Sequence, residues 1–209
     1  MATARGRLIT LEGLDGAGKT TLATTLAGAL DVRGLAVEVL REPGGVELSE
    51  RVRALVKDPA LRCGPRAEAL LYAAARAQLV EQRVAPLLAA GTWVLLDRFV
   101  DSSLAYQGAG RALGVEAVAA INAFATGGLA ADRTLLLRVA PAAGRARLAS
   151  RGEAPDRLEQ EQAGFFARIA EAYDELAQAE PQRVRVLDAE QDAPAVLAQG
   201  LAALGDLLP

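Results

Sequence analysis

The 209-residue chain contains no histidine and only one cysteine, Cys63. Without histidine, Ser-His-Asp sites, Cys-His sites and histidine-ligated metal centres are excluded. A single cysteine cannot form an intramolecular disulfide, which fits a reducing compartment. Any chemistry must therefore use carboxylates, arginines, hydroxyl groups, a bound ion or one of the two lysines, Lys19 and Lys57.

Long apolar runs are also lacking. No stretch approaches the roughly 20 apolar residues that cross a bilayer, and the start of the chain has no apolar signal-peptide region. We therefore expect a cytoplasmic protein with no membrane partner. The formal net charge of −3 argues against non-specific nucleic-acid binding, so no nucleic-acid partner is expected.

Strand-like and helix-like segments alternate along the chain. Apolar runs predict strands at 7–12, 36–42, 92–99, 133–140 and 183–189. Helical patterns cover 19–32, 47–57, 66–90 with a possible kink at Pro86, 102–107, 115–126, 141–152, 157–180 and 193–208. This alternation implies right-handed βαβ crossovers. Since no linker or repeat divides the chain, it predicts a single α/β domain over 1–209, with a central parallel sheet of about five strands flanked by helices.

One segment, GLDGAGKT at 13–20, matches G-x-x-x-x-G-K-[ST] between a predicted strand and a predicted helix. Glycine frees the backbone N–H groups to surround an anion, and the helix N-terminus adds partial positive charge. Lys19 can then reach the β- and γ-phosphates and Thr20 can ligate Mg²⁺. The residues expected to bind ATP phosphates are Gly13, Leu14, Asp15, Gly16, Ala17, Gly18, Lys19, Thr20 and Thr21. The spacing of GAGRALG at 108–114, in contrast, does not fit a dinucleotide fingerprint, and we expect a loop there.

The loop alone does not define the phosphate chemistry. A guanine-specific GTPase is disfavoured because the chain has no Asn-Lys pair. Ligands of open α/β sheets bind at the C-terminal ends of strands, and arginines, which suit phosphate, follow several predicted strands. These are Arg41, Arg98, Arg145, Arg147, Arg151 and Arg157. A kinase that transfers a phosphoryl group from a nucleoside triphosphate to a nucleoside monophosphate fits best. A deoxynucleoside kinase, a kinase for another monophosphate and a regulatory or partitioning ATPase remain alternatives.

Five segments narrow this choice: EGLDGAGKTT (12–21), REPGG (41–45), LLYAAAR (70–76), DRFVDSSLAYQGAGR (97–111) and RGEAPDRLEQE (151–161). In this order they resemble thymidylate kinases of the bacterial type, in which arginines of a mobile lid reach ATP. The resemblance spans residues 8 to about 190. It implies a P-loop nucleoside monophosphate kinase fold and a homodimer. The implied activity is phosphorylation of dTMP to dTDP by ATP, through direct in-line transfer with Mg²⁺.

The resemblance also implies residue roles. It assigns the reaction itself to Lys19, Asp15, Arg98, Arg151 and Arg147, with a mobile lid at about 141–160 and a further ATP contact from Arg157. Thr20 and Asp97 would serve the metal ion. Thymine would stack on Tyr72, where phenylalanine is usual, and Tyr106 would crowd the sugar 2′ position. The full set implied to bind dTMP is Glu12, Arg41, Tyr72, Arg76, Arg98, Ser103, Tyr106 and Gln107. Residues 188–191 would lie near adenine.

Overall fold

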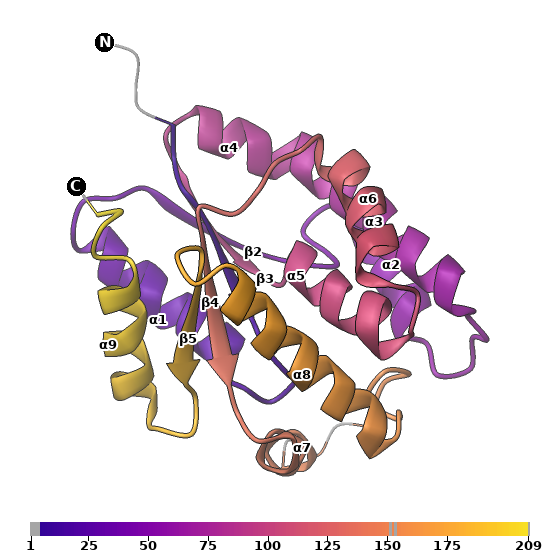
Figure 1. Ribbon diagram of the computed structural model, residues 1–209. Coiled ribbons are helices and arrows are strands. Elements are labelled where there is room, and N and C mark those ends of the chain that lie inside the picture. The colour runs from indigo at the N-terminus through magenta and orange to yellow at the C-terminus, as the bar shows by residue number, and fades with distance from the viewer. Residues whose placement is uncertain (1–4, 151, 153, 209) are drawn as a thin grey trace.

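A five-stranded parallel sheet forms the centre of the molecule, in the order β2-β3-β1-β4-β5 (Figure 1). The computed structural model describes residues 5–150, 152 and 154–208. Each predicted strand segment contains one strand, so the predicted parallel sheet of about five strands is confirmed. The strands are β1 (Leu8–Glu12), β2 (Val37–Arg41), β3 (Trp93–Asp97), β4 (Arg133–Arg138) and β5 (Val184–Asp188).

Helices cover both faces of this sheet (Figure 1). The α-helices are α1 (Lys19–Asp31), α2 (Glu47–Lys57), α3 (Pro65–Leu79), α4 (Ala85–Ala89), α5 (Val100–Ser103), α6 (Val115–Thr126), α7 (Pro141–Ala149), α8 (Ala163–Ala179) and α9 (Ala193–Ala203). Two π-helical segments, η1 (Val80–Val84) and η2 (Leu104–Gly110), continue α3 and α5. No helix in the part of the chain that the structure describes has both the length and the apolar character needed to traverse a membrane.

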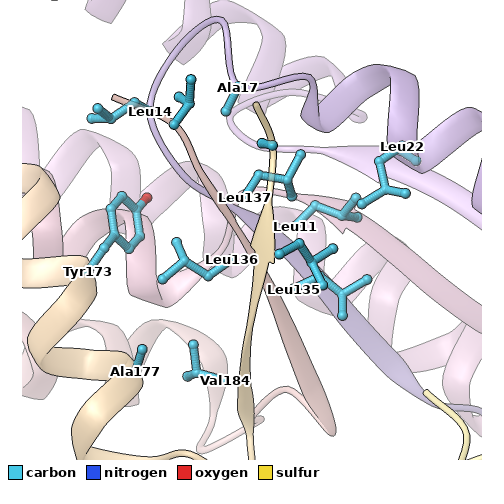
Figure 2. Packing of buried hydrophobic residues seen from close by; sticks show 14 of the residues in the cluster. Leu11, Leu14, Ala17, Leu22, Leu135, Leu136, Leu137, Tyr173, Ala177 and Val184 are labelled. Carbon is cyan, nitrogen blue, oxygen red and sulfur yellow. The ribbon is translucent and has the colours of Figure 1, made fainter. Parts of the chain in front are cut away.

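Alternate residues of the strands enter two different layers of core. Leu135 and Leu137 of β4 lie on the same side as Leu22 of α1, whereas Leu136 lies toward Tyr173 of α8 (Figure 2). All three leucines are buried, as expected for a parallel strand covered on both faces. The sheet is therefore rigidly enclosed, and its C-terminal edge is a fixed platform for the loops that follow the strands.

The loops after β1 and β3 are neighbours because these strands are adjacent and parallel, with Leu11 opposite Asp97. This register brings the glycine-rich loop beside the Asp97-Arg98 pair, although about 80 residues separate them in the sequence. Helix α7 lies beyond the C-terminal end of β4, at the same edge of the sheet (Figure 1). Sequence elements that we expected to act together are thus gathered at one edge.

Two helix predictions and one loop prediction need correction. The predicted helix at 66–90 changes to π geometry at Val80–Val84, because Pro86 has no N–H to continue the α-helical ladder. Residues 108–110, expected in a loop, instead end the π segment η2. The predicted helix at 157–180 begins only at Ala163. Before it, the Asp156 carboxylate accepts hydrogen bonds from the backbone N–H groups of Leu158 and Glu159, which holds a turn.

Candidate functional site

The glycine-rich loop requires glycine at the positions that approach other backbone most closely. Gly13 and Gly16 have φ values of 131° and 80°, in the left-handed region that side chains rarely adopt. A Cβ atom on Gly13 would lie 2.4 Å from the Leu137 carbonyl oxygen, and one on Gly16 would lie 2.3 Å from that of Gly144. Gly18, also in the left-handed region, directly precedes α1. The loop is therefore fixed between β4, α7 and the start of α1.

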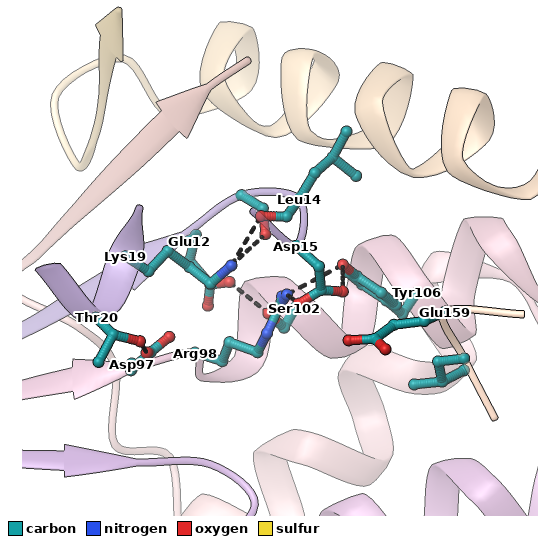
Figure 3. Close-up of polar contacts among 12 residues, drawn as sticks. Glu12, Leu14, Asp15, Lys19, Thr20, Asp97, Arg98, Ser102, Tyr106 and Glu159 are labelled. Carbon is teal, nitrogen blue, oxygen red and sulfur yellow. Dashed lines mark hydrogen bonds and ion pairs between the residues drawn. The ribbon is translucent and has the colours of Figure 1, made fainter. Parts of the chain in front are cut away.

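Lys19 folds back over this loop. Its Nζ donates to the carbonyl oxygens of Gly13 and Leu14 at 3.1 and 2.9 Å (Figure 3). Burial, with Arg98 adding to it, lowers the pKa of Lys19 to about 8 although nearby carboxylates act in the opposite direction. An anion bound in the loop would favour the charged form of this lysine.

Arg98 follows β3 in a left-handed conformation, with φ at 71°. Its Nη2 donates to Asp15 Oδ1 at 2.6 Å and to the Tyr106 hydroxyl at 3.1 Å, and its Nη1 donates to Ser102 Oγ at 3.0 Å (Figure 3). Burial alone would raise the pKa of Asp15, but Arg98 and Lys19 together hold it well below its ordinary value. The carboxylate is therefore ionised, and a strained backbone carries the guanidinium to it.

A hydroxyl and a carboxylate meet on the other side of Lys19. Thr20 Oγ1 donates to Asp97 Oδ2 at 2.9 Å (Figure 3). The described residues contain no cluster of three or more histidine, cysteine or acidic side chains able to hold a metal ion. The oxygen pair fits a hard divalent cation that takes its remaining ligands from water or a bound phosphate.

Two cavities meet at Asp15 and Arg98. The larger, of about 600 Å³, is open to the glycine-rich loop and to four basic side chains: Lys19, Arg41, Arg53 and Lys57. The smaller, of about 110 Å³, lies between α3, η2 and the turn at 156–159. Tyr72, Arg76, Ser103, Tyr106 and Gln107 line this second cavity, so the structure brings these predicted residues together. Arg98 therefore lies between the larger cavity, which suits a polyanion, and the smaller cavity, which suits the apolar and aromatic part of a ligand.

Like Arg98, the predicted dTMP-binding residues Arg41 and Arg76 already have protein partners. Arg41 Nη2 donates to the Glu50 carboxylate at 2.9 Å, although the side chain still lines the larger cavity. Arg76 is almost completely buried, and its guanidinium donates to Glu42, Ser103, Asn122 and the Phe99 carbonyl. Arg76 therefore supports one wall of the smaller cavity.

The predicted lid arginines are not gathered on the phosphate loop. Arg147 donates to the Ala189 carbonyl at 2.9 Å and lines a third cavity of about 160 Å³, beside Gly18, Thr21 and Gln191. Arg157 instead donates to Glu68 at 2.7 Å and to the Val56 carbonyl at 2.9 Å. Arg151 lies outside the described residues. The third cavity adjoins the segment 188–191 that we expected near adenine.

Glu12, which we expected to bind dTMP, is fully buried and lines neither the larger nor the smaller cavity. Its fully buried carboxylate accepts from the Phe99 N–H at 2.7 Å, from Ser102 Oγ at 2.5 Å and from the Tyr173 hydroxyl at 2.9 Å. Burial, followed by the nearby charge of Asp101, raises the pKa of Glu12. Because Phe99 directly follows Arg98 and Ser102 Oγ accepts a hydrogen bond from its guanidinium, this carboxylate holds the backbone that presents Arg98.

Sequence reasoning missed several residues of the site. Arg53 and Lys57 line both the larger and the smaller cavity, as does Glu159 from the turn at 156–159. The two basic residues stand four apart on α2, directly after the REPGG segment, and this spacing places them on one helix face. That signal was present in the sequence. No such signal pointed to Glu159, because its segment was predicted to be helical.

Comparisons with known proteins agree with this geometry. The family model described as thymidylate kinase matches residues 11–199. A thymidylate kinase of Alkalilimnicola ehrlichii is 50% identical over 196 residues, covering 92% of this chain and 89% of its own. One from Deinococcus radiodurans is 49% identical over 202 residues, covering 97% and 98%.

A solved structure is similar as well. The crystal structure of thymidylate kinase from Ehrlichia chaffeensis superposes with a TM-score of 0.78 at 28% identity, covering 96% of this chain and 99% of that one. A family model over most of the chain, relatives near 50% identity and a matching fold agree with the resemblance of the five sequence segments. The chain therefore belongs to the thymidylate kinase family.

Proposed function

We propose that the protein transfers the γ-phosphoryl group of ATP to dTMP, giving dTDP and ADP, by direct in-line displacement in the larger cavity. Lys19 and the backbone of 13–18 hold the donor phosphates. Arg98 holds the acceptor phosphate beside Asp15, close to where the two nucleotides meet. No general base is needed, because the acceptor phosphate is already anionic, and catalysis comes from positioning and charge stabilisation.

Basic side chains supply the charge that two adjacent nucleotides require. Arg41, Arg53 and Lys57 line the larger cavity together with Arg98 and Lys19. On closure, Arg151 approaches the transferring phosphoryl group from a mobile lid at about 141–160, with Arg147 and Arg157 as further ATP contacts. The present contacts of Arg147 with Ala189 and of Arg157 with Glu68 are then exchanged for phosphate.

Mg²⁺ is part of this proposal. Thr20 and Asp97 are the oxygen donors that fit it, directly or through bound water. Mg²⁺ neutralises charge on the β- and γ-phosphates in kinases of this kind. Replacing Asp97 by asparagine is expected to raise the Mg²⁺ concentration for half-maximal activity, and an unchanged requirement would remove Asp97 from this role.

The smaller cavity is proposed to bind thymine and deoxyribose. Tyr72 offers a stacking surface, while Ser103 and Gln107 offer polar groups to the base edge. The Tyr106 hydroxyl bonds both Arg98 and Asp15 Oδ2, the latter at 3.2 Å. These bonds fix the ring, which in this proposal lies beside the sugar 2′ position and favours dTMP over ribonucleotides.

The observation that carries the proposal is the Arg98–Asp15 pair at the junction of the two cavities. Arg98→Ala is expected to weaken dTMP binding more than ATP binding, because only the acceptor phosphate requires its fork of N–H groups. Isothermal calorimetry with each nucleotide measures this directly. Arg51→Ala, on the exposed surface of α2, is the matched control for loss of one arginine. A larger loss of ATP affinity would overturn the assigned role.

We further propose a cytoplasmic homodimer. Helix α3 packs against both α2 and α6, and apolar side chains are exposed on α3 and α6, with Leu70 at 56% and Phe124 at 92% exposure. A second copy covering this face would remove them from water. Phe124→Asp is expected to yield monomers in sedimentation equilibrium, whereas Val32→Asp, an equally exposed residue after α1, should not. The free thiol of Cys63 fits a reducing compartment.

A further inference from the structure

Glu68 of α3 enters the proposal above only as the partner that Arg157 leaves on closure, yet its carboxylate is fully buried and receives four hydrogen bonds. Gln107 Nε2 donates to Oε1 at 2.9 Å. Arg111 donates through Nε to Oε1 at 3.2 Å and through Nη2 to Oε2 at 3.1 Å. Arg157 Nη2 donates to Oε2 at 2.7 Å. Three residues that are distant in sequence therefore converge on one acid.

Glu68 is ionised in this setting. Burial alone would raise its pKa, but the hydrogen bonds from Arg111, Gln107 and Arg157 together hold it below the ordinary value. An ionised carboxylate can only accept hydrogen bonds. Gln107 can therefore satisfy Glu68 only with its Nε2 group, and the carbonyl Oε1 must point to the other side of the amide.

That other side belongs to the smaller cavity. Gln107 lines it together with Ser103, one turn earlier on the same helical segment. Gln107 Oε1 accepts no hydrogen bond from residues 5–150, 152 and 154–208. Ser103 Oγ accepts from Arg76 Nη1 at 2.9 Å, so its own hydrogen stays available to a ligand. The wall of the cavity thus presents an acceptor and a donor side by side.

We propose that Glu68 is a positioning residue that fixes the amide of Gln107, so that the cavity accepts a pyrimidine carrying a hydrogen at N3 and rejects one whose N3 is an acceptor. This inference rests on the proposed binding of dTMP in the smaller cavity. Thymine and uracil place an N3–H donor beside a carbonyl acceptor, which complements Gln107 Oε1 and the Ser103 hydroxyl. Cytosine places a lone pair opposite Oε1 instead, and the two acceptors repel.

Glu68→Gln tests this inference, because a neutral amide can donate or accept and no longer forces one orientation of Gln107. Steady-state kcat/KM is measured with dTMP, dUMP and dCMP in the wild type and in the variant. The ratio of kcat/KM for dTMP to that for dCMP is expected to fall about 10-fold or more, the usual cost of a mispaired buried polar group. Preference for dTMP over dUMP should not change, because both bases carry N3–H.

Controls separate positioning from a structural effect. Glu161→Gln removes the other partner of Arg111 without touching Gln107, and should change the ratio less than about 2-fold. In a Gln107→Leu background, Glu68→Gln should change the ratio no further, since the amide it acts through is gone. If Glu68→Gln does not fold, Glu68→Asp keeps the charge but shortens the side chain, and a reduced ratio is again expected.

The outcomes are distinct. Equal loss of kcat/KM for all three acceptors in a folded Glu68 variant would overturn the inference, because a merely structural contact with Arg157 would act in that way. A wild type that does not prefer dTMP to dCMP would instead contradict the proposed function of the cavity. A reduced ratio in the Glu68 variant alone, absent in Glu161→Gln, supports the positioning role.

Discussion

Replacing Glu12 by alanine is expected to destabilise the protein and to misplace Arg98. Glu12 ends β1 with a fully buried carboxylate that accepts three hydrogen bonds, from Phe99, Ser102 and Tyr173. These donors come from the segment after β3 and from α8, so one carboxylate joins three elements. Arg98 directly precedes the donor Phe99 and donates to the donor Ser102, and its left-handed φ of 71° needs such support.

The magnitude follows from the groups left without a partner. Each buried donor that loses its acceptor costs about 1–3 kcal/mol. Against this, burial raises the pKa of Glu12, which shows that the ionised carboxylate is itself costly to bury. We therefore expect a net loss at the lower end of the sum for three unpaired donors, about 3–5 kcal/mol in the free energy of unfolding. This is a large part of the roughly 5–15 kcal/mol typical of a folded domain.

Urea unfolding of the wild type, Glu12→Ala and Glu12→Gln measures the effect. Glutamine keeps the shape and can still accept from the Phe99 N–H, so it should lose less stability than alanine. The midpoint should shift with little change in the m-value. Breaking a buried hydrogen-bond network is among the most destabilising effects of a single substitution. A loss below about 1 kcal/mol for Glu12→Ala would therefore refute the reasoning. So would normal dTMP affinity in that variant, because Arg98 would then be held without Glu12.

Three further predictions concern the phosphate loop. Lys19→Ala should stay folded but lose roughly 100-fold or more in kcat, which a coupled ADP assay measures; near-normal turnover would remove Lys19 from the reaction. Without ligand, the pKa of Lys19 is lowered from 10.5 to about 8, so the unfolded chain binds more protons between these values. The free energy of unfolding of the wild type should therefore rise between pH 8 and pH 10.5 relative to that of Lys19→Ala in urea titrations. The same pH dependence in both proteins would contradict the lowered pKa of Lys19. Gly16→Ala should destabilise more than Gly34→Ala in the same titrations, because both glycines have a φ of 80° but only at Gly16 would the new Cβ atom lie 2.3 Å from a carbonyl oxygen; equal losses would show that backbone strain alone acts.

Periodicity was enough to locate the sheet, because the inner strands are apolar runs such as WVLLD in β3 and the edge strands β2 and β5 alternate apolar and charged residues. The helix ends were harder. At Ala163 the helix pattern extends backward into 157–161, but Arg157 N–H donates to the Lys57 carbonyl and Asp156 pairs with Lys57. These contacts are tertiary, and no local pattern encodes them.

The site also combines features that a local pattern predicts with features that depend on tertiary contacts. The glycine-rich loop is a local motif, so Gly13 to Thr20 could be assigned from spacing alone. The grouping of Arg98 with Asp15 followed from the strand-end rule and from the resemblance. The partners of Arg76 and Arg157, and the support that Glu12 gives to Arg98, depend on side chains from distant elements. Such support becomes visible only once the fold has brought these elements together.

In the proposed reaction, this cleft transfers a phosphoryl group from ATP to dTMP. The most direct measurement is coupled ADP release with ATP and Mg²⁺ against dTMP, dUMP, UMP, dCMP, dGMP, AMP and thymidine. We expect a strong and selective response to dTMP, weaker turnover of dUMP and little with UMP, since Tyr106 opposes a 2′-hydroxyl. Preference for another acceptor would contradict the roles of Tyr72, Tyr106 and Gln107, and slow ATP hydrolysis that ignores every acceptor would contradict the kinase itself.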